Sequence, residues 1–418
     1  MEKVATDIYT FSRLREDGFT YVDKTDALYA MASGDAGAQF FIARPRRFGK
    51  SLAVSTLKSL FLGERELFRG LAVEPKWDWS KKWPVLHLDM GSMQAPDVAE
   101  FRQLMADHLV DRARELGVES LTGSSPAVMF RRLIDALAAK SPDGRMVLLV
   151  DEYDKPLLGH LMKADVTEFR DELKAFYSVI KTLESKQRFA FITGVSKFSK
   201  VSIFSDLNNL NDWTMHPKTA TLFGYTHEEV LKYFPGRIHE LAEANGMSDD
   251  AEAFGEIVKW YDGYRFDENA ERVINPVSLG CCFDKNRFAN YWSKTAVPTF
   301  LIDILKKHPL NFATIDITDD RLEAYEPEAP DITTLLYQTV YLTIKSAQQL
   351  NEITYMVLTS RTVKWPILSQ RALFRHMSVW RRLPPSLRHL RRQGLFTRMT
   401  FQGSSRHSRR FLRIFRMI

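Results

Sequence analysis

Cysteine is scarce in this sequence, and long hydrophobic runs are missing. The 418 residues include two cysteines, the adjacent Cys281 and Cys282. This pair cannot build a disulfide framework and lacks the spacing of a zinc site, which favours a core or loop role in a reducing compartment. No stretch of about 18 apolar residues predicts a membrane span, and the N-terminus lacks the pattern of a secretory signal. We therefore expect a cytoplasmic protein without a membrane partner.

Acidic residues are missing from the last part of the chain. Residues 359–418 contain 14 Arg, one Lys and no Asp or Glu, whereas residues 1–358 contain 43 basic and 52 acidic residues. The net charge of +6 thus combines a tail of +15 with a main body of −9. The basic balance of the whole chain is therefore no evidence that the main body binds nucleic acid or a membrane surface.

Short apolar segments alternate with helical patterns through the first half of the chain. Four segments are typical of strands buried on both faces, and a weaker one follows: residues 39–43, 84–90, 146–150, 189–193 and, more weakly, 219–223. Helical spacing of apolar positions occupies residues 52–62, 126–139 and 165–185. The alternation predicts an α/β fold, with a mostly parallel sheet flanked by helices.

The pattern changes near residue 218. Thr226 and Glu229 form a predicted capping box, and mostly helical patterns follow to about residue 307. Residues 332–344 and 353–358 resemble a short terminal α/β piece. We expect three parts: an α/β domain over residues 1–218, a mainly helical, winged-helix-like lid over residues 219–358, and the Arg-rich tail over residues 359–418.

Residues 43–52 read ARPRRFGKSL and lie between a predicted strand and a predicted helix. A Gly-Lys-Ser at such a turn suits polyphosphate, because loop and helix N–H groups can cradle phosphate oxygens. Lys50 would reach the β- and γ-phosphates, and the Ser51 hydroxyl would hold Mg²⁺. Arg44 stands where the usual motif has glycine, so a chance Gly-Lys-Ser in a basic loop is the alternative. The predicted nucleotide-binding residues are Arg44, Pro45, Arg46, Arg47, Phe48, Gly49, Lys50, Ser51 and Leu52.

An acidic pair ends the predicted strand over residues 146–150. Phosphoryl transfer needs an acid near Mg²⁺ and an acid that orients the attacking water. Asp151 would bind the metal directly or through water, together with Ser51, and Glu152 would polarise the water. Taken alone, such a pair is more often a solvated turn or a helix cap. Its position after a Gly-Lys-Ser loop favours the catalytic interpretation.

A polar residue also ends the strand over residues 189–193. Thr193 precedes Gly194, with Ser196 just beyond. A polar side chain at this position in a nucleotide-hydrolysing sheet can sense the γ-phosphate, so Thr193 is a third catalytic candidate beside Lys50 and Glu152. A simple turn capped by the two hydroxyls is the equally good alternative.

Together these segments resemble the bacterial predicted AAA-ATPase-like proteins, which commonly carry a C-terminal nuclease domain of the PD-(D/E)XK type. The matching stretches are LREDGFTYVDKT (14–25), FIARPRRFGKSL (41–52), LLVDEYDKPL (148–157), FAFITGVSKFS (189–199), FSDLNNL (204–210), FGYTHEE (223–229), WYDGYRF (260–266), INPVSL (274–279), YWSKT (291–295) and LYQTVYLTIK (336–345).

The resemblance implies a P-loop NTPase fold with Walker A and Walker B elements. The family's own loop reads RPRRFGKS, which accounts for the residue that replaces glycine. It implies ATP and Mg²⁺ as ligands, with Lys50 and Ser51 at the nucleotide and Asp151 and Glu152 as the acidic pair. Full-length relatives would handle nucleic acid, and many members of this ATPase class assemble, although no interface signal is visible here.

Further polar residues in the matching stretches have weaker assignments. Tyr21, Asp23 and Lys24 precede the first strand and could approach the adenine. Arg265 is a candidate arginine finger, with structural pairing as the favoured alternative. A loop role is favoured for Asn208 and Asn209.

The Arg-rich tail begins where the family would continue toward its nuclease domain. One permitted coding of residues 360–366, shifted by one nucleotide, encodes FPNREVA, which resembles a PNxEV segment of the family. The same shift at residues 410–418 permits SIPTDIPND, which resembles its SIPYDI segment. We expect residues from about 360 onward to be out-of-frame translation without a packed structure. A genuine basic arm for nucleic acid is the alternative.

These observations predict an ATPase that hydrolyses ATP with Mg²⁺. It would be the motor or switch half of an ATPase–nuclease protein whose nuclease domain is missing here. A nucleotide-binding switch or scaffold module with negligible turnover is the alternative.

Overall fold

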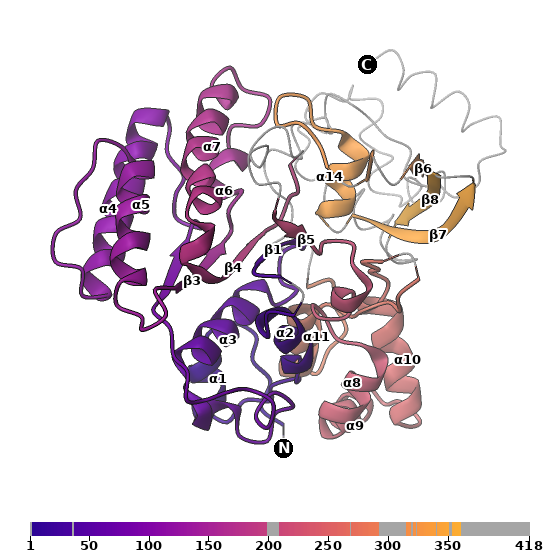
Figure 1. Ribbon diagram of the computed structural model, residues 1–418. Coiled ribbons are helices and arrows are strands. Elements are labelled where there is room, and N and C mark those ends of the chain that lie inside the picture. Colours follow the sequence, from indigo (N-terminus) through magenta and orange to yellow (C-terminus); the bar gives the residue numbers. More distant parts are fainter. Residues whose placement is uncertain are drawn as a thin grey trace, which may run out of the picture.

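The fold is seen in a computed structural model (Figure 1). The structure describes residues 2–35, 37–198, 209–267, 269–291, 315–318, 321–322, 324–339, 341–350 and 353–360. The prediction for Asn208 and the out-of-frame prediction for the tail beyond residue 360 lie outside the described residues.

A five-stranded sheet forms the centre of the α/β part. Its strands are β1 (Gln39–Ala43), β2 (Val85–Asp89), β3 (Met146–Asp151), β4 (Gln187–Gly194) and β5 (Asn211–Asp212). Their order is β2-β3-β4-β1-β5, and every pairing is parallel. Every residue of β1 and β3 is buried, as expected for strands covered on both faces. The predicted α/β fold of a P-loop NTPase is confirmed.

The weak fifth strand was predicted in the wrong place. The fifth strand is β5, whereas residues 217–219 form the short 3-10 helix η3 (Pro217–Thr219). The Thr219 hydroxyl donates to the carbonyl oxygens of Trp213, at 2.7 Å, and His216, at 3.0 Å. Such local side-chain bonds favour a turn over a ladder. The apolar residues that follow are buried without strand pairing.

Two groups of helices cover the sheet (Figure 1). α4 (Val98–Glu115), α5 (Pro126–Ala138) and α7 (Val166–Thr182) pack against one another on one face. α1 (Phe11–Glu16), α2 (Thr25–Ala32) and α3 (Lys50–Leu62) form the other group. The shorter α6 (Lys155–Leu158), η1 (Arg65–Phe68) and η2 (Glu184–Lys186) complete this part. The helices predicted over residues 52–62, 126–139 and 165–185 are thereby confirmed.

Four helices build a second core. They are α8 (His227–Tyr233), α9 (Pro235–Ala244), α10 (Asp250–Tyr261) and α11 (Pro276–Asp284). The predicted capping box is present, because Thr226 accepts the N–H of Glu229 and the Glu229 carboxylate accepts the N–H of Thr226. Cys282 lies in this core, and Cys281 packs against it on the same helix.

The chain continues into a small antiparallel sheet. Its strands are β6 (Ile315–Thr318), β7 (Leu342–Leu350) and β8 (Ile353–Ser360), in the order β6-β8-β7, and α14 (Ile332–Gln338) packs against β7. Buried residues of this piece belong to the same hydrophobic cluster as the parallel sheet. The predicted terminal α/β piece is present. The domain division at residue 218 and the winged-helix-like character stay predictions.

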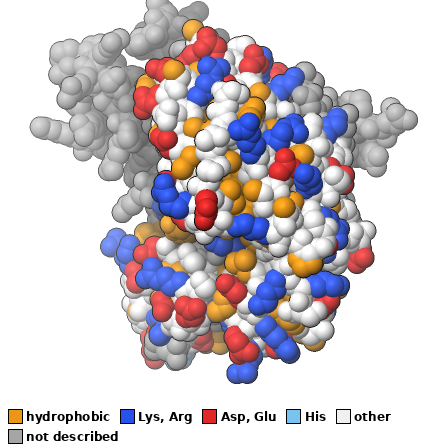
Figure 2. Space-filling model, turned by 60° about the vertical axis from the view of Figure 1, so that its left-hand side comes forward, with side chains coloured by type: hydrophobic (Ala, Val, Ile, Leu, Met, Phe, Trp, Pro, Cys, Tyr) orange, Lys and Arg blue, Asp and Glu red, His pale blue; other side chains and the backbone are white. Residues whose placement is uncertain are grey.

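The surface carries mixed charge. On the face shown in Figure 2, acidic and basic side chains are interspersed rather than gathered by sign. Among the described helices, none has both the length and the apolar character that crossing a bilayer requires.

Candidate functional site

The carboxyl ends of three neighbouring strands bring the predicted site together. In a parallel sheet these ends lie at one edge, which is where open α/β sheets bind ligands. β1 leads into the loop that ends at Gly49, β3 ends at Asp151, and β4 lies between them. The Arg44 N–H donates to the carbonyl oxygen of Gly194 at 2.9 Å, which ties the start of the loop to the end of β4.

The loop turns sharply before α3. Gly49 has φ of 100° and Arg47 has φ of 67°, both in the left-handed region. Glycine adopts this backbone readily, whereas Arg47 does so at a cost of about 1–2 kcal/mol. The turn leaves the first N–H groups of the 13-residue α3 at the mouth of the loop, which is the arrangement that binds phosphate.

Lys50 is the first residue of α3 and is buried. Its Nζ donates to the carbonyl oxygen of Pro45 at 3.0 Å, so the side chain folds back over the loop. Burial lowers the pKa of Lys50, and the nearby carboxylates of Asp151, Glu152 and Asp154 oppose that shift. An ammonium held inside the loop is suited to a phosphate.

Ser51 and Asp151 meet across the site. The Ser51 side chain lies near the Asp151 carboxylate, and the Oδ1 atom of Asp151 accepts the Glu152 N–H at 2.9 Å. Burial raises the pKa of Asp151, whereas the nearby Ser51 hydroxyl and the charge of Lys50 lower it. A hydroxyl beside a carboxylate offers the oxygen ligands that Mg²⁺ prefers. The donor set therefore fits this metal.

Glu152 has an unusual backbone. Its φ of 52° is left-handed, which is uncommon for residues other than glycine. Its side chain is one-third exposed, with Oε2 at 3.9 Å from the Nζ of Lys155. Strained residues of this kind cluster at functional sites, where the fold holds them in place. The strain turns this carboxylate out of the line of β3 while Asp151 stays buried.

Two further acids at this edge escaped the sequence analysis. Asp154 is fully buried and accepts the backbone N–H groups of Val195, at 3.2 Å, and Ser196, at 2.7 Å. It thereby joins the acidic segment to the chain after β4. Asp89 ends β2 in register with Asp151. The signals were the third acid in DEYD and an acid near the end of the strand predicted over residues 84–90.

Thr193 lies inside the sheet. It is fully buried, and its hydroxyl donates to the carbonyl oxygen of Ile42 on β1 at 2.7 Å. In this structure the hydroxyl thus links β4 to β1. Its role as a γ-phosphate sensor stays a prediction.

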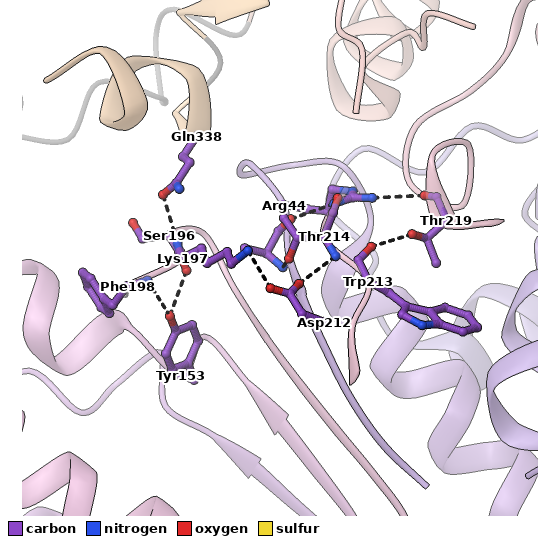
Figure 3. A network of polar contacts seen from close by, with 11 residues as sticks. Arg44, Tyr153, Ser196, Lys197, Phe198, Asp212, Trp213, Thr214, Thr219 and Gln338 are labelled. Carbon is purple, nitrogen blue, oxygen red and sulfur yellow. Dashed lines mark hydrogen bonds and ion pairs between the residues drawn. The ribbon is translucent and has the colours of Figure 1, made fainter. Parts of the chain in front are cut away.

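Arg44 extends away from the loop into the protein (Figure 3). Its guanidinium donates to the carbonyl oxygens of Ala43 at 2.9 Å, Thr219 at 3.1 Å and Thr214. It also lies over the ring of Phe266, 4.2 Å from the centroid. Burial lowers the pKa of Arg44 to about 10. The Arg44 side chain fixes the base of the loop. A contact between Arg44 and nucleotide would therefore involve backbone atoms of Arg44, and this assignment stays a prediction.

The remaining loop residues differ in exposure. Arg47 is exposed and Arg46 is partly buried, so both leave positive charge near the mouth. Phe48 is buried, and Leu52 is partly buried in the first turn of α3. The site assignments of Pro45, Arg46, Arg47, Phe48 and Leu52 stay predictions.

The segment before β1 makes structural contacts. Tyr21 is buried, and Asp23 accepts the N–H groups of Thr25, at 2.9 Å, and Ala72, at 2.8 Å. Lys24 pairs with Glu229 of α8, with Nζ 2.6 Å from Oε2. These contacts anchor the segment, so an approach to adenine finds no support in the described contacts.

Arg265 and Asn209 complete the list of earlier candidates. The N–H of Arg265 donates to the Thr343 hydroxyl at 3.1 Å, and its carbonyl oxygen accepts the Tyr337 hydroxyl at 3.0 Å. These two hydrogen bonds fix the backbone of Arg265. The arginine-finger role of its side chain stays a prediction. Asn209 lies in a turn before β5, as expected for a loop residue.

Comparison with known proteins identifies relatives of this chain. The family described as "Predicted AAA-ATPase" matches residues 5–204, which include the loop, the acidic pair and Thr193. A protein of Azotobacter chroococcum mcd 1, described as "Uncharacterized protein in vnfD 5'region", is 36% identical over 398 residues. The match covers 94% of this chain and 73% of that protein. No solved structure matches.

The extent of that match bears on the Arg-rich tail. A span that covers 94% of the 418 residues cannot end at residue 360, so it includes part of the tail. Out-of-frame translation of the tail, which stays a prediction, would have to be compatible with this similarity between the tail and the relative.

Proposed function

Because the chain belongs to the predicted AAA-ATPase family, we propose that it binds ATP with Mg²⁺ and hydrolyses the γ-phosphate bond. The observation that carries this proposal is the proximity of the Ser51 side chain to the Asp151 carboxylate. These residues stand far apart in the sequence, one beginning a helix and the other ending a strand. Their meeting beside a buried Lys50 forms the hydroxyl, carboxylate and ammonium set that an ATP·Mg²⁺ site needs.

Each residue would have a separate task. The N–H groups at the start of α3 would hold phosphate oxygens, and Lys50 would exchange its bond to Pro45 for one to a phosphate. Ser51 and Asp151 would hold Mg²⁺, which when bound neutralises charge that develops on the phosphate oxygens. Glu152, less buried than Asp151 and displaced from β3, would orient a water for in-line attack.

The wider role remains part of the proposal. Residues 219–358 would act as a lid that responds to the nucleotide. Full-length relatives would couple this response to a nuclease domain and to nucleic acid, and assembly into oligomers is a further expectation. In this proposal the loop over residues 44–51 is a Walker A element, and the strand end with Asp151 and Glu152 is a Walker B element.

The test separates binding from turnover. Fluorescent ATP binding and phosphate release would be measured for the parent, Lys50→Ala, Glu152→Gln and the control Glu168→Gln, an exposed acid on α7. We expect Glu152→Gln to keep its affinity while release falls by about 100-fold or more. Lys50→Ala should lose binding by at least about tenfold, and Glu168→Gln should match the parent.

The outcomes distinguish the rival functions. If Lys50→Ala binds ATP as tightly as the parent, the proposed site is wrong. If the parent binds tightly without release, the nucleotide-binding switch or scaffold replaces the ATPase.

A further inference from the structure

The side chain of Phe48 connects the phosphate loop to the region after the sheet. Phe48 is 1% exposed, and its ring centroid lies 5.5 Å from that of Tyr264 and 5.3 Å from that of Phe266. Its carbonyl oxygen accepts the N–H of Gly224 at 3.2 Å. The residue directly before Gly49 is thus packed by the segment YDGYRF and by the turn after η3.

Arg44 enters the same cluster from the other end of the loop. Its guanidinium lies 4.2 Å from the ring centroid of Phe266 and 5.4 Å from that of Phe223. A cation over aromatic faces, removed from water, is held more strongly than at an exposed site. Both ends of the loop therefore contact one set of aromatic rings. We call this set the aromatic clamp; it consists of Phe223, Tyr264, Phe266 and Tyr337.

The clamp is joined to α14. The rings of Tyr264 and Tyr337 stack at 5.5 Å, and the Tyr264 hydroxyl donates to the Tyr337 carbonyl oxygen at 2.6 Å. Tyr337 belongs to the last turn of α14. We therefore expect that a loop movement that displaces Phe48 also shifts α14, through the contact between Tyr264 and Tyr337.

The same turn of α14 also contacts the chain after β4 (Figure 3). Gln338 accepts the N–H of Lys197 at 2.9 Å, and the Nζ of Lys197 pairs with Asp212 at 2.6 Å. Gln338 thus contacts the chain after β4, and the preceding Tyr337 contacts Tyr264, whose ring packs near Phe48 of the loop after β1. These segments border the proposed nucleotide site.

We propose that Phe48 and Tyr264 are positioning residues through which the aromatic clamp holds the phosphate loop ready for nucleotide and passes its state to α14. This inference rests on the proposed ATP site. A loop with glycine at position 44 would rely on its own backbone, whereas this loop carries a left-handed Arg47 and is supported from outside. Holding N–H groups in place before binding increases affinity. By reciprocity, bound nucleotide stabilises the clamp.

The experiment uses a matched pair of substitutions in the full chain. Phe48→Leu removes a ring from the clamp, and Phe130→Leu removes an equally buried ring that stacks on Phe176 at 4.4 Å between α5 and α7. The dissociation constant for ATP·Mg²⁺, kcat and Tm would be measured. We expect Phe48→Leu to weaken ATP binding by about fivefold or more with kcat within about twofold, whereas Phe130→Leu lowers Tm with unchanged affinity.

A second pair keeps the test decisive if Phe48→Leu does not fold. Tyr264→Leu removes the opposing ring without altering the loop and should weaken ATP binding as Phe48→Leu does. Tyr264→Phe keeps the ring and should bind ATP as the parent does. Hydrogen exchange should show that ATP protects α14 in the parent and in Phe130→Leu but less in Tyr264→Leu.

The results separate two failures. If the parent binds no ATP, the proposed function is wrong. If the parent binds ATP but Phe48→Leu and Tyr264→Leu keep the affinity of Phe130→Leu, or if ATP leaves α14 exchange unchanged in the parent, the clamp has no positioning role.

Discussion

Burial competes with ionisation at several single residues of the sheet edge. Burial raises the pKa of Asp151 and lowers the pKa of Lys50, so both shifts favour the neutral forms. Each group opposes the shift of the other through its own charge. A bound divalent cation would favour the ionised form of Asp151, and a bound polyphosphate would favour that of Lys50. The proposed ligands would thus favour the charged forms that burial opposes.

His87 on β2 gives a prediction about pH and stability. Burial, followed by the nearby Lys58, lowers the pKa of His87 from 6.5 to about 4. Above pH 6.5 the imidazole is neutral in both the folded and unfolded chain. As the pH falls from 6.5 toward 4, the unfolded chain binds the proton first, so the free energy of unfolding decreases.

His87→Leu should remove this contribution. We expect the loss of stability between pH 7 and pH 5 to shrink by about 2 kcal/mol relative to the parent. Urea unfolding at both values measures the difference. Parallel losses in the parent and the variant would show that His87 does not titrate in this way.

At the scale of elements, α8 is fixed at its start by a single carboxylate with two tasks. Glu229 closes the capping box, with Oε2 at 2.9 Å from the Thr226 nitrogen, and pairs with the largely buried Lys24. Burial lowers the pKa of Lys24, and Glu229 is the first group that opposes this shift. Removing the negative charge would leave a partly buried cation without its main partner.

We therefore predict that Glu229→Gln costs about 2 kcal/mol of unfolding free energy. The neighbouring Glu228 is exposed in the same first turn, so Glu228→Gln serves as the control and should stay within about 0.5 kcal/mol. Chemical denaturation measures both variants. Equal costs for the two would mean that the pair with Lys24 contributes nothing.

The elements also show what the sequence could and could not predict. Strands β1 to β4 were found because each contains a short, mainly apolar segment, as buried parallel strands do. β5 was missed because Asn211 and Asp212 are polar and only two residues form the strand. The apolar residues within 219–223 pack in the interior of the protein and do not pair as a strand of the sheet.

The site divides in the same way. The meeting of the Gly-Lys-Ser turn and the acidic pair was predictable because each follows a strand of one parallel sheet, so both lie at the same edge. Asp154 and the aromatic clamp were not, because their roles come from contacts between distant segments. The sequence marks Arg44 as an anomaly, and only the fold shows which rings receive its side chain.

At the scale of the whole molecule, the charge division between body and tail leads to a test on the gene. Sequencing the encoding DNA from about codon 340 past the stop should show that the shifted frame stays open and encodes an Asp followed by a (D/E)xK element. A shifted frame that closes at once would make the tail a genuine product. Salt-dependent DNA binding lost on removal of residues 361–418 would then be the expected property.

The N-terminal segment that precedes β1 contacts the second core. Val22 lies in that core, the backbone of Glu2 accepts from Arg237 at 2.8 Å, and Lys24 reaches Glu229. During synthesis these first residues leave the ribosome about 10–40 s before partners some 200 positions later. Until residue 291 has emerged, these first residues lack their native partners in the second core, unless chaperones shield them. We therefore expect a fragment that ends at residue 218 to be less stable than the same residues in the full chain, because Val22, Glu2 and Lys24 would lack these partners.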